Sequence, residues 1–323
     1  MMDRRAAFLK AAGFIFCILA VAMSSGSAGA WGFTAHFIIT RGAIEALPPG
    51  LRTFYLSHAD FIAAHSIDPD KWRWDDLDWE TVCPPERGLA VLAGDERPRH
   101  FLDADAVAPY PFTEIPRDFD QYRERAGDEW EDWGSAPWTA AAYTDLLRDE
   151  MAAPEPDLHR ILCRSAILAH YVADLSQPFH LTVNYDGQLS GLRGIHSRFE
   201  RNLVEYYDGV LRARVRSGAP QALLLDSPIE AAFEMLVDGY PSVHALLRAD
   251  LLAQRVAPLA EGESAGDNPA YMRELWQHSG DIAADRMTYG AERVASFWLT
   301  AWDSAGRPDL HALTPGSAVD IER

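Results

Sequence analysis

The chain has 323 residues, 48% of them hydrophobic, so it can bury a sizeable core as one large domain or two small ones. With 29 basic against 48 acidic residues its net charge is −19, which argues against broad electrostatic binding to a nucleic-acid backbone. A cluster of divalent metals would still make its own pocket locally positive.

Residues 1–30 are predicted to be a signal peptide that is removed on export. Arg4 and Arg5 precede an apolar run at 11–23, which is too short for a bilayer span of about 20 residues. The small residues that follow suit cleavage after Ala30. The paired arginines resemble a twin-arginine signal with imperfect spacing, so both that route and the Sec route stay open. We expect the mature protein, residues 31–323, to be periplasmic or extracellular.

The first half of the mature chain alternates predicted helix with irregular sequence. Apolar residues at helical spacing predict a helix that carries His36 and ends at Pro48. A second short helix, capped by Ser57, is predicted over 60–64, followed by a turn around Pro69. Residues 75–135 are rich in proline, tryptophan and acids and are predicted to be irregular. A loop of that length in a compact domain tends to be functional.

The second half is predicted to be almost entirely helical. Period-2 apolar runs of strand quality are lacking, so the predicted fold is all-α, a single multi-helix domain. Helices are predicted from Gly134–Trp138 to about Met151, from Leu158 behind an Asp157 cap, beyond Glu200 to about Val215, behind a Ser227–Glu230 capping box, after Ser242, and from Asn268 to about Trp302.

Residues 166–200 concentrate the residue types that bind metals. His170 and Asp174 stand four positions apart on a predicted helix, so both side chains leave one face. His196 and Glu200 repeat that spacing, and His180 lies between the pairs. One such pair is usually a solvated helix face, but five nitrogen and carboxylate ligands so close together exceed what one tetrahedral zinc needs. The stretch therefore predicts a metal site.

The cysteines do not add to that site. Cys17 would leave with the signal peptide, so Cys83 and Cys163 remain, too few for a thiolate zinc centre. In an exported protein they could form a disulfide. Cys163 is equally compatible with a role as a small buried apolar residue. Both alternatives stay open.

These residues resemble the zinc-dependent phospholipase C and single-strand-specific nuclease superfamily, which includes bacterial phospholipases C and fungal S-one/P-one-type nucleases. The resemblance covers most of the mature chain. Its nine ligand positions occur in order as Trp31-Gly32…His36, Asp70, His100-Phe101, His170-xxx-Asp174-xxxxx-His180 and His196-xxx-Glu200.

The resemblance implies a trinuclear zinc site between helices, with three Zn²⁺ as cofactors. One zinc would be held by Asp70, His100, His170 and Asp174, a second by Asp174, His36 and the α-amino nitrogen and carbonyl oxygen of Trp31, and a third by His180, His196 and Glu200 with open positions.

The Trp31 ligand links export to metal binding. A free α-amino group exists at residue 31 only after cleavage behind Ala30, and it must lose a proton to bind a metal. An extra residue before Trp31 is predicted to cost one zinc and most of the activity.

The implied activity is that of a zinc-dependent phosphoric diester hydrolase. Close metal pairs stabilise the attacking and leaving oxygens of an in-line displacement at phosphorus. Asp70 would orient the attacking water or take its proton. Arg73 could stabilise charge on the phosphate, although a plain surface cation is an equal alternative.

The sequence favours single-stranded nucleic acid as substrate, in a nuclease- or nucleotidase-like reaction. The short spacing from Trp31 to His36 and the presence of Arg73 match the nucleases. Phe101 and Asp103 match positions that stack on and hydrogen-bond a base there, although core packing of Phe101 is an alternative.

The alternative substrate is a phospholipid. Glu200 is the phospholipase choice, and Asp186-Gly187-Gln188 replaces a nuclease Gly-Gly-Asn segment. Against a choline lipase, Lys71 would repel a quaternary ammonium. A more distant alternative is a helical binding protein whose zincs only stabilise the fold. No obligate protein partner is evident from the sequence.

Overall fold

The computed structural model describes residues 31–73, 82–218 and 221–313, so the predicted signal peptide lies outside the described residues. Within those ranges the chain forms helices and no β-strand, apart from one antiparallel bridge that pairs Leu102 with Gly134. The prediction of an all-α, multi-helix domain is therefore confirmed. No helix in the described ranges is both long and apolar enough to cross a bilayer.

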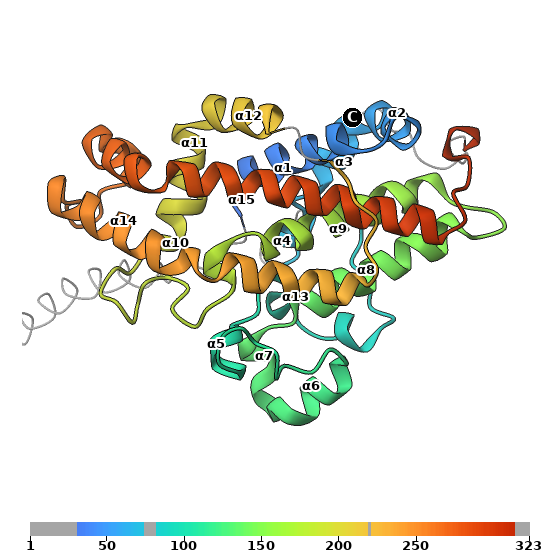
Figure 1. Ribbon diagram of the computed structural model, residues 1–323, viewed down its shortest axis with the longest axis horizontal. Helices are drawn as coiled ribbons and strands as arrows, with labels where there is room; N and C mark the ends of the chain where they lie inside the picture. The colour runs from blue at the N-terminus through green and yellow to red at the C-terminus, as the bar shows by residue number, and fades with distance from the viewer. Residues whose placement is uncertain (1–30, 74–81, 219–220, 314–323) are drawn as a thin grey trace, which may run out of the picture.

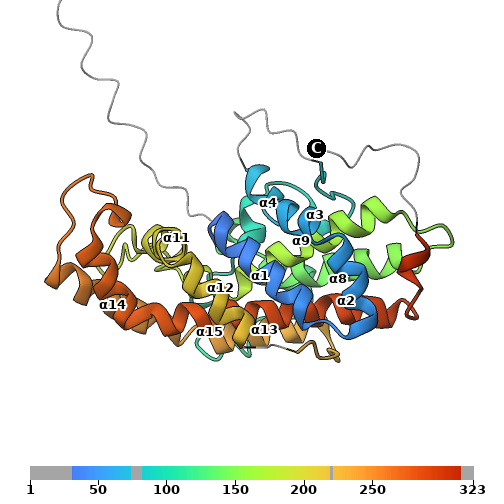
Figure 2. The same ribbon diagram turned by 90° about the horizontal axis from the view of Figure 1, so that it is seen from above.

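Helices stack in layers around α9, which spans Leu158–Leu175 (Figures 1 and 2). Seen from above, α1, α9 and α8 lie between α15 on one side and α3 and α4 on the other (Figure 2). The longer helices are α1 (Phe33–Ala46), α2 (Pro49–Ser57), α3 (Ala59–His65), α8 (Ala136–Met151), α12 (Asp208–Ser217), α13 (Pro228–Gly239), α14 (Ser242–Val256) and α15 (Pro269–Ser304).

The α9 helix is central because it is apolar on nearly all sides. From Leu158 to Leu175 almost every side chain is buried, which is the pattern of a helix enclosed by other helices. On α15, the buried Trp298 donates from Nε1 to the carbonyl oxygen of Ser165 on α9 (3.0 Å) and stacks on Tyr55 of α2, with ring centroids 4.5 Å apart. The metal-ligand candidates on α9 therefore sit on a rigid support.

The helix starts agree with the capping residues predicted from the sequence. Asp157 before α9, Ser227 before α13 and Asn268 before α15 each accept a hydrogen bond from the backbone N–H three residues later. A cap of this kind stabilises a helix by about 1 kcal/mol. These starts are set by local chemistry, which is why the sequence predicts them.

Near the N-terminus, one helix is not predicted from the sequence and two expectations are wrong in detail. The α2 helix starts with Pro49 at its first position, where a proline has no N–H that needs a partner. Ser57 does not cap α3; its hydroxyl donates to the Phe54 carbonyl oxygen at the end of α2. The expected turn around Pro69 contains the short helix α4 (Asp68–Lys71), which a proline in its first turn permits.

Two longer segments also differ from expectation. The described part of the predicted irregular stretch holds η1 (Ala90–Leu92), η2 (Arg97–His100), α5 (Ala104–Val107), α6 (Phe119–Ala126), η3 (Gly127–Glu129) and α7 (Trp130–Trp133). Elements of one or two turns are too short to show a hydrophobic period. The helix predicted beyond Glu200 is divided into α10 (Ile195–Ser197), a π-helical η5 (Arg198–Leu203), α11 (Val204–Tyr206) and α12.

A disulfide joins Cys83 to Cys163, with Cα atoms 5.2 Å apart, which settles the alternative that the sequence leaves open. Because Cys163 lies on α9, the bond ties the segment after residue 82 to the central helix. It also explains the burial of both side chains.

Candidate metal centre

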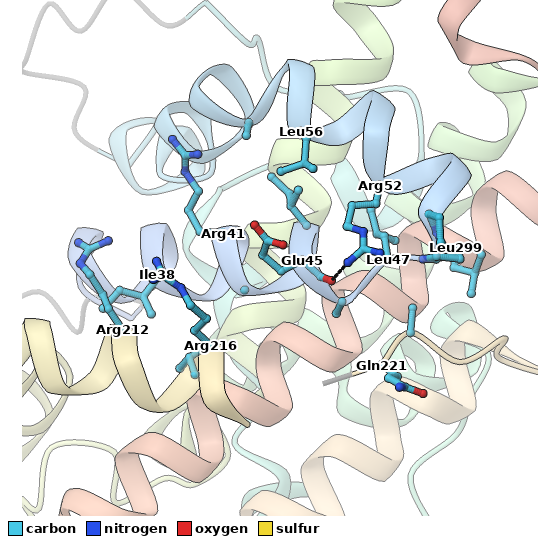
Figure 3. A pocket seen from close by; sticks show the side chains of 18 of the residues that line it. Ile38, Arg41, Glu45, Leu47, Arg52, Leu56, Arg212, Arg216, Gln221 and Leu299 are labelled. Carbon is cyan, nitrogen blue, oxygen red and sulfur yellow. Dashed lines mark hydrogen bonds between the residues drawn. The ribbon is translucent and has the colours of Figure 1, made fainter. Parts of the chain in front are cut away.

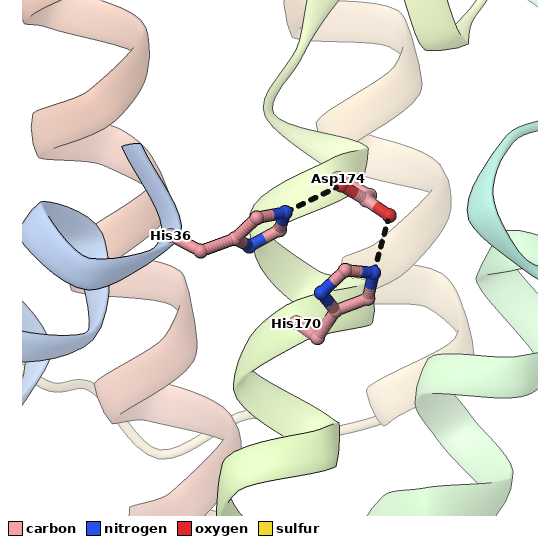
Figure 4. A group of neighbouring side chains, drawn as sticks. All are labelled: His36, His170 and Asp174. Atoms are coloured by element: carbon pink, nitrogen blue, oxygen red, sulfur yellow. Dashed lines mark ion pairs between the residues drawn. The ribbon is translucent and has the colours of Figure 1, made fainter. Parts of the chain in front are cut away.

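The α9 helix presents His170 and Asp174 toward α1, and both side chains have an exposed fraction of 0% (Figure 4). On α1, His36 reaches across so that its Nε2 lies 3.3 Å from Asp174 Oδ1. Its ring stacks on His170 with centroids 4.1 Å apart. The other carboxylate oxygen, Asp174 Oδ2, lies 3.2 Å from His170 Nε2. Asp174 thus faces two imidazoles through two different oxygens.

Trp31 lies against the same carboxylate. Its backbone nitrogen is 3.3 Å from Asp174 Oδ1, at the same distance as His36 Nε2. The indole is fully buried, donates from Nε1 to Ser176 Oγ (3.1 Å) and packs near Phe199. The side chain therefore holds the backbone nitrogen of residue 31 at the cluster.

Asp70 of α4 and His100 of η2 approach from the opposite side. His100 Nδ1 lies 3.0 Å from Asp174 Oδ2, 2.9 Å from His170 Nε2 and 3.8 Å from Asp70 Oδ1. All of these donors are buried. We call the following set the first cluster: the Trp31 nitrogen, His36, Asp70, His100, His170 and Asp174.

His180, His196 and Glu200 form the second cluster. His180 closes η4 (Pro178–His180), His196 lies in α10 and Glu200 in the π-helical η5. Glu200 Oε2 is 2.8 Å from His196 Nε2 and 3.8 Å from His180 Nε2. A π-helical turn is rare and is frequent at functional sites. The structure therefore brings together all nine residues that the sequence singles out as ligands, in two neighbouring groups.

Backbone carbonyl oxygens orient two ligand histidines. His170 Nδ1 is 2.8 Å from the Ser66 carbonyl oxygen, and His180 Nδ1 is 2.8 Å from the His100 carbonyl oxygen. A carbonyl only accepts, so in each ring Nδ1 carries a proton and Nε2 is the nitrogen that faces the cluster. Such partners fix the ring and its tautomer around a metal.

The charges in the first cluster favour ionised carboxylates and a neutral His36. Burial lowers the pKa of His36 to about 4, with a further contribution from His170. Burial alone would raise the pKa of Asp174, but His170 and His180 hold it well below the usual range. Asp70 shows the same balance, with burial outweighed by Arg73 and His170.

The second cluster differs in this respect. Burial raises the pKa of Glu200 well above its usual range, and the hydrogen bond from Gln177 Nε2 (3.2 Å) offsets this only in part. The negative charges of Asp70 and Asp174 add to the rise. For Glu200, the hydrogen bond from Gln177 and the positive charge of Arg73 do not outweigh burial and the two nearby carboxylates.

The donor set fits metal ions, on two observations. Both ring nitrogens of His36 are buried without a hydrogen-bond partner, although an unpaired buried polar atom is costly. The donor contacts among His36, His100, His170 and Asp174 measure 2.9–3.3 Å, close to the edge of about 3.3 Å of a tetrahedron with zinc–nitrogen arms of about 2.0 Å. Three groups have one ligand atom per residue within 4.8 Å of one another: His36–His170–Asp174, Asp70–His100–His170 and His180–His196–Glu200.

Of the predicted catalytic residues, Arg73 lies at the first cluster, where its Nη2 donates to Asp70 Oδ1 at 2.6 Å. That contact favours a site residue over a plain surface cation. Lys71 Nζ is 2.7 Å from Asp68 Oδ1, so a carboxylate offsets its charge. The repulsion of a quaternary ammonium expected from Lys71 is therefore weakened.

The two predicted base-contact residues lie beside the centre rather than among the ligands. The Phe101 ring is half-buried, with the Arg97 guanidinium 5.8 Å from its centroid and Gly134 against its edge, where a Cβ would come within 2.8 Å of the ring. Asp103 is 7% exposed, and burial, with a contribution from Asp105, raises its pKa to about 8. This environment gives no support to base stacking on Phe101.

Sequence reasoning missed the residues that surround the ligands. Glu96 lies one helical turn before His100, with Oε1 3.5 Å from His100 Nε2. Gln177 contacts Glu200, and Ser66 contacts His170 through its backbone. The spacing of four residues between Glu96 and His100 could have indicated their contact from the sequence. Contacts made by backbone carbonyls leave no such pattern in the sequence.

A further group of potential donors and a surface groove lie outside the two clusters. His65, Asp68 and Cys83 are close together, but the Cys83 sulfur is oxidised in the disulfide. A groove of about 930 Å³ runs along α1 between α2 and α12 and includes none of the ligand candidates (Figure 3). Its wall mixes arginines with apolar side chains: Ile38, Arg41, Leu47, Arg52, Leu56, Arg212, Arg216 and Leu299.

Comparisons with known proteins leave the family open. No family model matches the chain. A protein of Bradyrhizobium tropiciagri described as a probable serine protease is 26% identical over 169 residues, an alignment that covers 45% of this chain and 21% of that protein. The alpha toxin from Clostridium absonum shares 14% identity at a TM-score of 0.47, over 85% of this chain and 64% of the toxin.

These similarities set limits on what can be transferred. The chain spans about a fifth of the length of the protease-like relative. The structural match to the toxin, with a TM-score of 0.47, carries no argument about activity. Neither protein is described as a nuclease, so the expectation of a nucleic-acid substrate gains no support from them. Function must therefore be inferred from the site.

Proposed function

We propose that the mature protein is an exported, zinc-dependent phosphodiester hydrolase. The single observation that carries the proposal is the convergence of nine ligand-type residues from separate segments on one buried centre, in which donor atoms of His36, His100, His170 and Asp174 contact one another at 2.9–3.3 Å. A purely structural zinc site closes with four protein ligands. The second cluster offers three side-chain ligands, so a metal held there would keep a position for water or substrate.

Different residues would bind the metals and contact the phosphate. The first cluster would hold two ions, with Asp174 between them, and the second cluster would hold the third. When bound, zinc ions supply Lewis-acid stabilisation of phosphoryl oxygens and lower the pKa of water. Asp70 accepts from Arg73 and faces His100, so it would orient the nucleophilic water and take its proton. Arg73 would pair with charge developing on the phosphate.

A phospholipid is the substrate that we favour. Two features support it: Glu200 is the residue that the resemblance links to phospholipases, and Asp68 offsets the charge of Lys71. The supports for a nucleic acid are weaker than the sequence suggests, because Phe101 has Arg97 near its ring and Gly134 at its edge. Single-stranded nucleic acid is the alternative substrate and is tested beside the phospholipid.

The test is a paired assay on protein that begins at Trp31, with and without a chelator. We expect chelator-sensitive release of phosphorylated head group from phosphatidylcholine vesicles and little release of nucleotides from single-stranded DNA. The opposite pattern would assign Arg73, Phe101 and Asp103 to a nuclease. Bound zinc with no hydrolysis of either substrate would overturn the proposal in favour of a structural site.

A second version of the protein tests the role of the N-terminus. The Trp31 nitrogen lies 3.3 Å from Asp174 Oδ1 and can bind a metal only as a free amine. Protein that retains Ala30 should contain about one zinc fewer and lose most of its activity. Equal zinc content and equal turnover in the two proteins would remove Trp31 from the ligand set.

A further inference from the structure

The groove along α1 concentrates positive charge in a chain that is acidic overall. Its described lining residues include one glutamate and four arginines: Arg41, Arg52, Arg212 and Arg216. The whole chain has a net charge of −19, so this local excess of cations runs against the composition. A concave surface of one charge sign raises the local concentration of ligands of the opposite sign. The charges of the groove therefore favour an anionic ligand.

The cations gather where α1 and α12 lie side by side (Figure 3). The guanidinium carbons of Arg41 and Arg212 each lie 5.2 Å from the centroid of the Phe37 ring, so two cations converge on one aromatic side chain. Arg216 follows Arg212 by one turn of α12, and like charges at that spacing destabilise a helix. An anion bound between these groups would relieve their repulsion.

The acidic partners of these arginines leave donors for a ligand. Arg41 pairs with Asp60, and Arg212 Nε lies 2.6 Å from Asp208 Oδ1. The Asp60 side chain is 96% exposed, and ion pairs at such positions contribute little to stability. Arg41 Nε is buried without a hydrogen-bond partner in the described part of the chain. A guanidinium has five N–H groups, so it can hold its carboxylate and a phosphate oxygen together.

The other end of the groove is apolar. Leu47, Leu56 and Leu299 line it, and Leu56 is 46% exposed. Arg52 at this end already donates from Nη1 to the carbonyl oxygen of Glu45 (3.2 Å). A small inorganic anion would leave these leucines in water, whereas a hydrocarbon chain would cover them and gain from their burial. The two ends together match a ligand with an anionic head and an apolar tail.

We propose that this groove binds a single anionic lipid, whose phosphate pairs with Arg41 and Arg212 and whose acyl chain lies along the leucines. Guanidinium groups bind phosphate oxygens through paired, charge-assisted hydrogen bonds. The groove volume of about 930 Å³ suits a ligand of this size. Because the groove contains none of the nine metal-ligand candidates, this site is separate from the metal centre and does not depend on the proposed hydrolysis. It would hold the protein at a membrane that contains anionic lipids.

The test is calorimetric titration of the protein that begins at Trp31 with dodecyl phosphate, below the critical micelle concentration of this probe. We expect saturable binding of one molecule per chain, and the same affinity after treatment with a chelator. Inorganic phosphate and dodecanol, which carry only the head or only the tail, should each bind at least tenfold more weakly. Loss of binding with the chelator would assign the probe to the metal centre and overturn the inference. Equal affinity for inorganic phosphate would overturn it in favour of a free anion.

A matched pair of variants tests the arginines. Arg212 and Arg214 both lie on α12, both side chains are 38% exposed, and each is 2.6 Å from one aspartate. Arg214 is not among the residues that line the groove. Arg212→Gln should weaken the binding of dodecyl phosphate about tenfold, as expected for the loss of hydrogen bonds to a charged group, and Arg214→Gln should leave it unchanged. Equal losses in the two variants would mean general electrostatic attraction and would overturn the inference.

Leu56→Ser tests the acyl chain at an exposed position where the fold does not depend on the side chain. It should weaken the binding of dodecyl phosphate severalfold and leave that of inorganic phosphate unchanged. An unchanged affinity for dodecyl phosphate would refute the apolar end of the site.

Sedimentation velocity tests whether a second copy of the chain occupies the groove instead. We expect the same molecular mass for the wild type and for Arg212→Gln. A wild-type dimer that this substitution dissociates would overturn the lipid site in favour of self-association. Absence of hydrolysis in the paired assay would refute the proposed function, but it would leave the result of these binding measurements intact.

Discussion

The first and second clusters lie next to each other, yet they treat their carboxylates in opposite ways. Asp174 and Asp70 are surrounded by histidines and Arg73, which hold both pKa values below the usual range despite complete burial. Glu200 is equally buried, but its pKa is raised, because burial and the nearby anions outweigh its one amide hydrogen bond. A nearby histidine is therefore not sufficient to keep a buried carboxylate ionised. The sum of the surrounding charges determines its pKa.

This contrast has a consequence for metal binding. The first cluster has its carboxylates ionised in advance, so a cation there mainly displaces the proton of His170, whose pKa is raised by Asp174 despite burial. The second cluster must also ionise Glu200 when a cation arrives. We expect metal binding at the second cluster to be weaker and to depend more steeply on pH.

The largest expected effect on activity comes from removing the negative charge of Asp174 in the first cluster. Asp174→Asn takes a carboxylate from between His36, His100 and His170. Loss of the metals there should cost several kcal/mol of transition-state stabilisation, on the order of 10³-fold in kcat/KM. Zinc content by elemental analysis should fall while the second cluster keeps its ion. Full zinc content with normal turnover would show that the first cluster does not need the Asp174 carboxylate to bind its metals.

Asp70→Asn probes the proton acceptor of the same cluster. The amide keeps a contact with Arg73 but cannot take a proton from water, so we expect a loss of about 10²-fold in kcat with the helical fold intact. Circular dichroism checks the fold and steady-state kinetics the rate. Turnover at the wild-type level would exclude Asp70 as the base.

Glu200→Gln tests the second cluster through the pH dependence of stability. In the unfolded chain Glu200 ionises near pH 4.5, whereas in the folded chain its raised pKa keeps the proton. The unfolded state therefore loses its proton first, and stability falls as the pH rises above 4.5. The metal-free variant should be more stable than the metal-free wild type at neutral pH, by urea unfolding. The loaded variant should lose roughly 10-fold in activity. A less stable metal-free variant would contradict the contrast.

Outside both clusters, Asp103 is expected to affect activity least and to act instead on the pH dependence of stability. Burial raises its pKa from 3.8 to about 8, so the folded protein loses stability as the pH rises from about 4 to about 8. At 1.36 kcal/mol per pKa unit, the upper limit of that loss is about 6 kcal/mol. Asp103→Asn should flatten the pH dependence of urea unfolding across this range. An unchanged slope would mean that Asp103 is ionised in the folded state.

Much of this molecule follows from the sequence by itself. The sequence predicts the ligand types, the helix that carries His170 and Asp174, and the caps at Asp157 and Asn268. It can do so because helix periodicity and capping act over four residues. The all-α fold class follows from the same local patterns. The short helices after residue 82 do not, since one turn is too brief to show a period.

Only the tertiary structure decides what surrounds each ligand. The backbone nitrogen of Trp31 meets Asp174 from 143 positions away, and Cys83 meets Cys163 across 80. Whether Asp174 ionises while Glu200 keeps its proton depends on desolvation and on charges brought in by other helices. The same is true of the His100 nitrogen that faces the cluster. Sequence spacing specifies which residues can share a helix face, but the free energy of a buried charge is set by neighbours that only the folded chain supplies.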